Sequence, residues 1–381
     1  MFIAIFIIAI VVVIMIHEFG HFATAKAFGM KAERFFLGFG PTLWSVQRGE
    51  TEYGVKAIPA GGFVKITGMS SFEDMDPADE PRAFYSKPAW QRAIVLIAGS
   101  GTHFVLAILL LWAALALIGL PSGAATNTVA VVVDDSPAAE AGLQSGDAIV
   151  AVDGVETVAF EAVQEEVAAR PGETVTLTVE RDDERREVAA TLAAQEDEAG
   201  EQIGFLGIAP EAEVERVPPG QALVLTVSGD LSVFRLAELT VVGLIDAFSP
   251  EGLAAWIGQL TTDGPREPEG PMSLVGAGQV AGELGRQGDL FGFIALLVML
   301  NLVLGILNLL PLPPLDGGHV AVLVVEEGVN KARRLRGNHE RWLIDPARLT
   351  PIALAVILFF GVIFITAVTI DILRPASEIL Q

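Results

Sequence analysis

Two histidines and a glutamate follow a long apolar run near the start of the chain. Residues 1–16 carry no charged side chain, and HEFGH occupies positions 17–21. On a helix, residues i and i+4 lie about 40° apart, so His17 and His21 present their imidazoles to one point from adjacent turns. Such a pair suits tetrahedral zinc, which binds imidazole nitrogens at about 2.0–2.1 Å. Glu18 would lie beside the metal without binding it, where it can accept a proton from the attacking water.

The alternative role for these three side chains is structural, with each satisfied only by hydrogen bonds. In a soluble helix that alternative would compete well. Inside an apolar span, however, each ionisable group is expensive unless it is paired or takes part in chemistry. The pattern therefore favours a zinc site with Glu18 as its general base.

A catalytic zinc needs a third protein ligand, and NLLPLPPLDGGH at 308–319 offers two candidates. The prolines deny this segment a helix, and Gly317 with Gly318 should let the backbone turn sharply. Because a helix rises about 1.5 Å per residue, residue 17 lies roughly 24 Å along the first span, near the side where the third span also ends. Asp316 is the expected ligand, since an aspartate on a broken helix at membrane depth is a ligand candidate. His319 is the second choice.

Four stretches are long enough to cross a bilayer, which takes about 20 apolar residues each. Of the 381 residues, 52% are hydrophobic, and the mean hydropathy is +0.53, too apolar for an ordinary soluble protein. We expect transmembrane helices at 1–26, 93–120, within 290–319 and at 351–373. A signal peptide is the alternative for the first, but no Lys or Arg precedes the apolar run and no small-residue cleavage site follows it.

Basic residues indicate the orientation of these spans. Residues 26–92 carry nine Lys and Arg, and residues 320–349 carry six. Because loops rich in Lys and Arg stay in the cytoplasm, both segments should be cytoplasmic. The expected protein is a multi-pass plasma-membrane protein with both termini outside. The absence of cysteine excludes a disulfide framework and leaves the redox compartment open.

Two segments on the cytoplasmic side are expected to have different structures. Residues 27–92 contain a run of Phe, Val and Gly with turn signals, typical of a β-hairpin that dips toward the membrane, followed by a polar loop. A plain cytosolic hairpin is the alternative. Residues 320–350 read as a basic loop. His103, inside the second span, is expected to make a polar packing contact, with zinc binding as the alternative.

The segment between the second and third spans should lie outside the cell. Residues 121–289 hold 31 of the 47 acidic residues and only 8 of the 24 basic ones, which makes nucleic acid an unsuitable partner. Residues 127–194 have the turn and strand signals of a compact α/β domain, and GFLGIAP that follows should leave it as a short strand. Within 195–289 we further expect interfacial helices over 221–260, with a fifth span as the alternative, and a Gly-rich loop from 261.

Together these motifs resemble a known family. SPAAEAGLQSGDAIVAVDG at 136–154 is similar to the PDZ domain. HEFGH, a GFG-containing hairpin, this insertion and NLLPLPPLDGGH resemble the site-two protease family of intramembrane zinc metalloproteases, in the single-PDZ actinobacterial form of its RseP-type branch. The implied fold is a polytopic α-helical membrane protein with four transmembrane helices, a membrane-associated β-hairpin and an inserted extracytoplasmic α/β PDZ-like domain.

The resemblance also implies site residues. It assigns zinc to His17, His21 and Asp316, and the general base to Glu18. Substrate contacts would come from Asn308 and from the hairpin, at Gly61, Gly62, Tyr53 and Val55. Two departures stand out: family members often have Asn where this chain has His103, and the second PDZ domain of the RseP type is missing.

The expected function is zinc-dependent cleavage of transmembrane segments of single-span proteins, with the lipid bilayer as the surroundings and a pre-trimmed anti-sigma factor as the substrate that the resemblance implies. One alternative is an anchored zinc peptidase that acts on soluble peptides; the inner position of the metal opposes it. Another is a non-enzymatic PDZ scaffold, which would have no need of Glu18 as a base.

Overall fold

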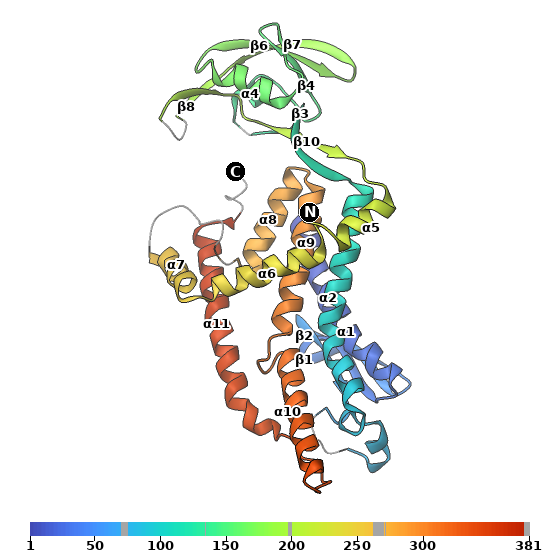
Figure 1. Cartoon of the computed structure of the whole chain (residues 1–381). Helices are drawn as coiled ribbons and strands as arrows, with labels where there is room; N and C mark the ends of the chain where they lie inside the picture. The colour runs from blue at the N-terminus through green and yellow to red at the C-terminus, as the bar shows by residue number, and fades with distance from the viewer. Residues whose placement is uncertain (70–74, 134, 197–199, 262–269, 271, 377–381) are drawn as a thin grey trace. The chain divides into compact units, whose positions relative to one another are not determined.

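The computed structural model describes residues 1–69, 75–133, 135–196, 200–261, 270 and 272–376. The chain divides into two compact units (Figure 1). We call residues 1–114, 220–285 and 290–381 the membrane unit, and residues 115–219 with 286–289 the PDZ-like domain.

Four apolar helices form the framework of the membrane unit. They are α1 (Phe2–Ala27), α2 (Ala89–Leu117), α9 (Leu290–Asn308) and α11 (Thr350–Leu373), and they are the candidate spans among the described residues. The predicted polytopic helical fold is confirmed. The helices α1 and α2 approach closely at Gly20, where an added Cβ would lie 2.6 Å from the Ala98 carbonyl oxygen and 2.8 Å from Thr102 Cγ2. Small residues at such crossings are typical of helix packing in membranes.

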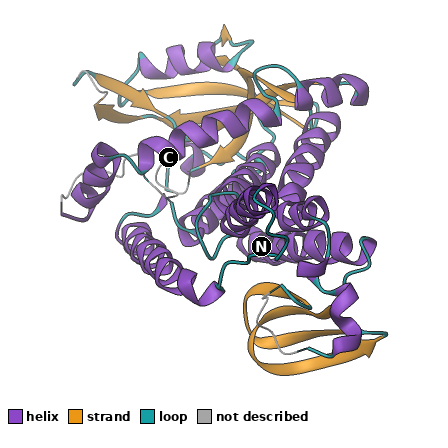
Figure 2. Cartoon of the chain, turned by 60° about the horizontal axis from the view of Figure 1, so that its bottom comes forward, coloured by secondary structure: helices purple, strands orange, loops and turns teal. Residues whose placement is uncertain are grey.

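The β-hairpin is a curled sheet made from two long strands, β1 (Ala32–Arg48) and β2 (Thr51–Ile66) (Figure 2). Residues 34–37 have partners on both sides, at 52–55 and at 62–65, while residues 44–48 pair with 51–55. The segment order across the sheet is therefore 62–66, 32–37, 51–55 and 44–48. This order makes 62–66 an edge of the sheet, whereas 51–55 lies inside it.

An ion cluster fixes the hairpin turn to the end of α1. Glu50, at the turn, accepts hydrogen bonds from Arg82 at 2.8 Å and from Lys26. These two cations lower the pKa of Glu50 to about 2, against the opposing effect of burial. The carboxylate is thus charged at neutral pH and holds the hairpin beside α1.

Residues expected to form the basic loop at 320–350 are helical in their first half. The helix α10 (Asp316–Leu335) begins at the predicted ligand, so the loop prediction is wrong there. Its Leu323 packs with Ala25, Ile66 and Val95, and its acidic residues Glu326 and Glu327 lie 3.6 and 2.6 Å from the buried guanidinium of Arg92 on α2. This apolar and ionic packing, rather than local sequence, holds the segment as a helix.

Gly317 and Gly318 do not make the sharp turn that was expected. They lie buried in the first turn of α10, where added Cβ atoms would meet the Leu309 and Leu310 carbonyls and the Leu312 backbone. The glycines are needed for close approach of backbone to backbone.

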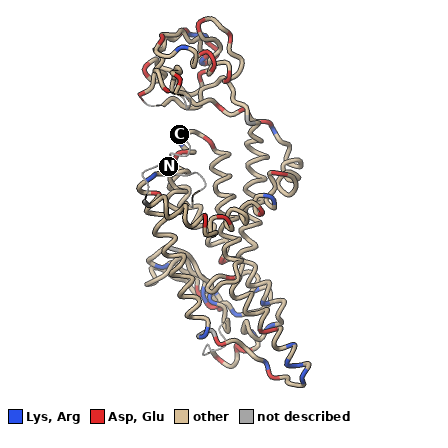
Figure 3. Tube along the Cα trace, turned by 60° about the vertical axis from the view of Figure 1, so that its left-hand side comes forward, with Lys and Arg blue, Asp and Glu red and all other residues tan. Residues whose placement is uncertain are grey.

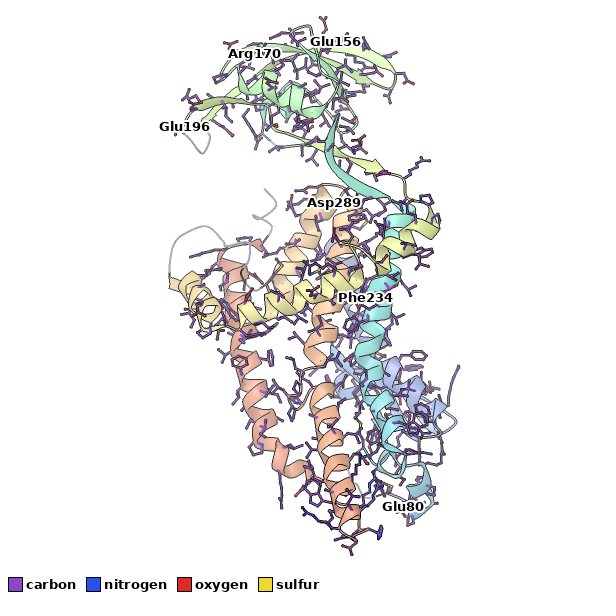
Figure 4. The ribbon with its side chains drawn as sticks, in the orientation of Figure 1. Glu80, Glu156, Arg170, Glu196, Phe234 and Asp289 are labelled. Atoms are coloured by element: carbon purple, nitrogen blue, oxygen red, sulfur yellow. The ribbon has the colours of Figure 1, made fainter. Side chains whose placement is uncertain are left out.

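The described residues between 219 and 286 form the helices α5 (Pro219–Val227), α6 (Val233–Ala247), α7 (Pro250–Thr261) and α8 (Leu274–Arg286). None of them is a candidate span, so a fifth span is not found among the described residues. On α6, Phe234 is 61% exposed (Figure 4), and the interfacial position of these helices stays a prediction.

The Gly-rich loop expected from 261 is wrong for the residues that form α8. Gly278, Gly282 and Gly285 lie against Phe6, Ile3 and Phe2 of α1, so the glycines form a packing surface. The start of α8 is capped by a residue distant in sequence, because the Asp371 carboxylate accepts hydrogen bonds from the Ser273 and Gly276 N–H groups at 2.9 and 3.0 Å. Residues 262–269 and 271 of the expected loop lie outside the described residues.

The PDZ-like domain is a sheet with two short helices. Its order is β10-β3-β4-β6-β7, with β5 beside β4, and β8 pairs with β9. The elements are β3 (Leu120–Val132), α3 (Pro137–Glu140), β4 (Ala148–Val152), β5 (Val155–Glu156), α4 (Phe160–Ala168), β6 (Thr174–Arg181), β7 (Glu184–Thr191), β8 (Ala193–Glu196), β9 (Gln202–Phe205) and β10 (Ile208–Glu215). The segment GFLGIAP does not leave the domain as expected, because β10 pairs with β3 from Ile208↔Val132 to Glu215↔Leu120.

One buried carboxylate organises this domain. Asp147 is fully buried and accepts two hydrogen bonds from Arg181, at 2.6 and 2.7 Å, and one from the Gln144 N–H at 2.8 Å. Burial alone would raise the pKa of Asp147, but these hydrogen bonds outweigh it and hold the pKa below its usual value. The pair ties the start of β4 to the end of β6.

We predict that Arg181→Met destabilises the PDZ-like domain, because it leaves the buried carboxylate of Asp147 without its charged partner. Hydrogen–deuterium exchange of the full chain at one fixed pH should show faster exchange in peptides from β4 and β6. Arg185→Met is the matched control, since Arg185 makes an exposed ion pair with Glu180 and should leave exchange unchanged. Equal exchange in both variants would contradict the assigned role of Arg181.

Candidate metal centre

Two elements of the membrane unit bring three ligand groups together. His17 and His21 stand one turn apart on α1, and Asp316 is the first residue of α10. The two Nε2 atoms are 3.2 Å apart, and each lies 3.3 Å from Asp316 Oδ2. Among the described residues, this is the group of His and acidic side chains that could hold a metal ion. The structure thus brings together the three residues that the sequence indicated.

The triangle has the size that zinc requires. Ligands at about 2.0–2.1 Å from a tetrahedral metal lie about 3.3–3.4 Å from one another, close to the observed separations of 3.2, 3.3 and 3.3 Å. Three ligands leave a fourth position for water or substrate, as in catalytic sites.

The atoms that face the centre of this triangle are hydrogen-bond acceptors, as a bound cation requires. His21 Nδ1 lies 2.7 Å from the Val95 carbonyl oxygen, which can only accept, so this ring nitrogen carries the proton, and in neutral His21 the other nitrogen, Nε2, presents a lone pair. Asp316 Oδ2 is buried without a hydrogen-bond partner in the described part of the chain. A metal ion at the centre would give these facing acceptors the positive charge that they lack.

Gly99 on α2 provides the room for this centre. An added Cβ there would meet His21 Nε2 and would lie 2.7 Å from His17 Cε1. Any side chain at this position would therefore occupy the space into which both imidazoles point. The sequence motifs did not indicate this role of Gly99, because it depends on the distance between α1 and α2.

The side chain of Glu18 extends from α1 to the hairpin. Its Oε2 accepts a hydrogen bond from the Val64 N–H at 3.0 Å, and an added Cβ on Gly62 would lie 3.1 Å from Glu18 Cγ. Val64 and Gly62 belong to the sheet edge 62–66, so the carboxylate is held by the same edge that faces α1. This contact positions the predicted base beside the three ligands without making it one of them.

The two other histidines considered as ligands lie elsewhere. His319 is not part of the three-residue group; it lines a cavity of about 310 Å³ with Arg92 and Glu326. His103 contacts His17 Nδ1 at 3.2 Å, on the side of the ring away from the centre. Its expected role as a polar contact agrees with this position.

The predicted substrate-binding residues occupy different places. Gly61 and Gly62 lie at or beside the sheet edge near Glu18. Tyr53 and Val55 belong to the inner segment, which has partners on both sides, and Tyr53 packs on Phe22 with ring centroids 5.8 Å apart. The backbone of that inner segment is therefore not open to a further strand. Asn308 is the last residue of α9 and is half-buried.

Comparison with known proteins gives consistent similarities. Residues 5–342 match peptidase family M50. The chain is 34% identical to the zinc metalloprotease Rip1 of Mycobacterium tuberculosis over 396 residues, covering 98% of this chain and 97% of that protein. It is 35% identical to a putative zinc metalloprotease of a Nostoc species over 327 residues, covering 83% of each. A solved PDZ domain of an SdrC-like protein from Listeria monocytogenes matches 22% of this chain and 84% of its own length, with 27% identity and a TM-score of 0.19.

We predict that Asp316→Ala weakens zinc binding by more than the roughly 10–100-fold that loss of an outer partner costs, because it removes one of three direct ligands. His319→Ala should retain most of the zinc. The measurement is zinc content and chelator competition on the purified full chain. If His319→Ala loses zinc and Asp316→Ala keeps it, the third ligand is assigned wrongly.

Proposed function

Because the chain belongs to peptidase family M50, the site-two proteases, and is a membrane zinc metalloendopeptidase, we propose that it cuts transmembrane segments of single-span membrane proteins. The observation that carries this proposal is the position of the three acceptor atoms of His17, His21 and Asp316 directly after an apolar span, with Glu18 beside them. A peptidase with its catalytic groups at that depth meets substrates within the bilayer.

Each group has a distinct part in the proposed reaction. His17, His21 and Asp316 would hold the zinc, which supplies the Lewis acidity that activates water and polarises the scissile carbonyl. Glu18 accepts the proton of the attacking water and later delivers it to the leaving amine. The Val64 N–H keeps one carboxylate oxygen of Glu18 oriented, which leaves the other for this proton transfer.

The substrate backbone also needs partners. A transmembrane helix must unwind before a protease can reach a peptide bond, and the freed N–H and C=O groups then need partners where bulk water is absent. Addition of the substrate as a strand to the sheet edge 62–66 would supply them. Its position beside Glu18 supports this edge over the inner segment that holds Tyr53 and Val55. Asn308 would contact the substrate from the end of α9.

The proposed orientation places the hairpin and the C-terminal end of α10 in the cytoplasm. Lys and Arg positions are concentrated around the end of α10, in the segment 331–341 (Figure 3), and the positive-inside tendency supports this assignment. Both termini and the PDZ-like domain would then lie outside. The centre would lie near the inner face, which opposes a peptidase for soluble extracellular peptides.

The proposed substrates are single-span proteins whose outer part has already been removed, such as an anti-sigma factor. The resemblance to site-two proteases supports this class, and we propose that the inserted domain takes part in selecting the substrates. In the proposed orientation the PDZ-like domain is outside and the zinc near the inner side, so the domain would act on the admission of substrates and not on the scissile bond. We favour exclusion of bulky outer portions over peptide capture as its role.

Glu18→Gln should keep the fold and the bound zinc but abolish cleavage, because an amide cannot accept the proton of water at neutral pH. Zinc content and cleavage of a model transmembrane substrate should be measured on the same preparation. The amide can still accept the Val64 hydrogen bond through its oxygen, so the hairpin contact is retained. Unchanged turnover would eliminate Glu18 as the base.

Removal of the PDZ-like domain should admit untrimmed substrates. Leu120 and Glu215 are paired in the sheet, and paired residues lie about 4.5–5.5 Å apart. A bridge of about four Gly and Ser residues can therefore replace 121–214. We expect cleavage of untrimmed substrates, with trimmed ones cut at a similar rate. Loss of cleavage of trimmed substrates by a folded, zinc-loaded protein would indicate that the domain delivers substrate instead.

A further inference from the structure

A buried chain of polar side chains joins His17 to a neighbouring helix. His17 Nδ1 lies 3.2 Å from His103 Nε2, and His103 Nδ1 lies 3.1 Å from Asn301 Oδ1. The Asn301 amide in turn donates to the Leu297 carbonyl oxygen at 2.8 Å. His103 on α2 is 3% exposed and Asn301 on α9 is fully buried. Polar groups in such surroundings are expensive unless they are paired, and the function described above does not account for either residue.

The direction of every hydrogen bond in this chain follows from its last member. The Leu297 carbonyl can only accept, so Asn301 must turn its NH₂ group toward it and its oxygen toward His103. That oxygen also only accepts, so His103 Nδ1 must carry a proton. In neutral His103 the other nitrogen, Nε2, is then the acceptor. His17 Nδ1 must therefore be the donor.

This direction leaves His17 Nε2 without a proton, as a metal ligand requires. The opposite direction would place a proton on His103 Nε2 and a lone pair on His17 Nδ1. The proton of neutral His17 would then sit on Nε2, the atom that faces His21 and Asp316. The polarity of the chain thus selects between a metal-binding and a blocked tautomer of His17.

We propose that His103 is a positioning residue which, together with Asn301, holds His17 in its metal-binding tautomer and ring orientation. The inference rests on the zinc role proposed for His17. His21 contacts a backbone carbonyl directly, that of Val95. His17 is linked to a backbone carbonyl through the side chains of His103 and Asn301. A backbone carbonyl therefore fixes the tautomer of each histidine ligand. For His21 this carbonyl is on α2, and for His17 it is on α9.

The residues of α2 that support the two histidine ligands lie on one face of that helix. Val95, Gly99 and His103 recur at every fourth residue, so they line one side of the helix. The first contributes a carbonyl to His21, the second provides space for the imidazoles, and the third accepts from His17. Gly305 on α9 lets this face approach closely, since an added Cβ there would lie 3.0 Å from His103 Cβ.

The test compares two substitutions that keep the size of the side chain. His103→Leu removes both nitrogens. His103→Gln offers an oxygen to His17 and an N–H to Asn301. For the purified full chain in detergent, zinc affinity measured against a chelator should fall about 10–100-fold in the leucine variant. It should stay within about threefold of the unmodified protein in the glutamine variant.

Matched controls separate positioning from packing. Thr102→Val is the control on the same helix, because the Thr102 hydroxyl donates to the Gly99 carbonyl within α2, and it should bind zinc as the unmodified chain does. Thermal unfolding without zinc should be alike for both His103 variants. Normal affinity in the leucine variant would overturn the proposal. So would equal losses in both variants with lower zinc-free stability, since that result indicates packing alone.

A second measurement reads the tautomers directly. The chain has five histidines, so ring ¹⁵N spectra of histidine-labelled, zinc-loaded protein can be assigned by substitution. We expect a proton on Nδ1 of both His17 and His103; a proton on Nε2 of His103 would overturn the proposal. If the unmodified chain binds no zinc, or binds it equally well with His17→Ala, the zinc site itself is wrong and both proposals fail together.

Discussion

Three acceptor atoms that face one another at about 3.3 Å inside an apolar helical unit are the constraint on which the rest of the structure depends. Such a group is unfavourable without a cation, because the lone pairs of these facing acceptors repel one another and Asp316 Oδ2 is buried without a hydrogen-bond partner in the described residues. The helices must therefore supply a partner for the other ring nitrogen of each histidine ligand. The observed contacts do this: Val95 serves His21, and His103 serves His17. The close approach that these contacts need explains the glycines at 20, 99 and 305.

The third ligand depends on how α10 is held. Asp316 begins this helix directly after a proline-containing segment, so its own neighbours in sequence cannot fix it to α1. The helix is fixed instead by Leu323 in the apolar cluster with Ala25 and Val95, and by the ion pairs from Arg92. An ion pair between buried groups has little stabilising value by itself but is strongly destabilising when broken. Its value here is geometric, since it sets the distance between α2, which supports the histidines, and α10, which carries the aspartate.

The sheet edge at 62–66 links the metal centre to the substrate that we propose. An exposed edge of a sheet normally invites pairing with another chain. Here one N–H of that edge, from Val64, is used to hold Glu18. The curl of the hairpin, in which residues 34–37 have partners on both sides, leaves this edge toward α1 and places Tyr53 inside the sheet. Recognition of an unwound segment and orientation of the base would thus use the same few backbone groups.

The sequence alone determined the elements whose signals are local. Four apolar runs predicted the spans, and the spacing of His17 and His21 put both on one side of a helix, because helical periodicity is a property of adjacent turns. The sequence also predicted Asp316 as a ligand, because the prolines before it end the preceding helix. Other features needed the tertiary structure. The helices α8 and α10 looked like loops because contacts that hold them come from distant elements, such as Asp371 for α8 and Arg92 for α10. The role of His103 depends on His17, 86 residues away, and on Asn301, 198 residues away. Such contacts leave no periodic trace in the sequence, so only the packing of three helices decides which ring nitrogen carries the proton.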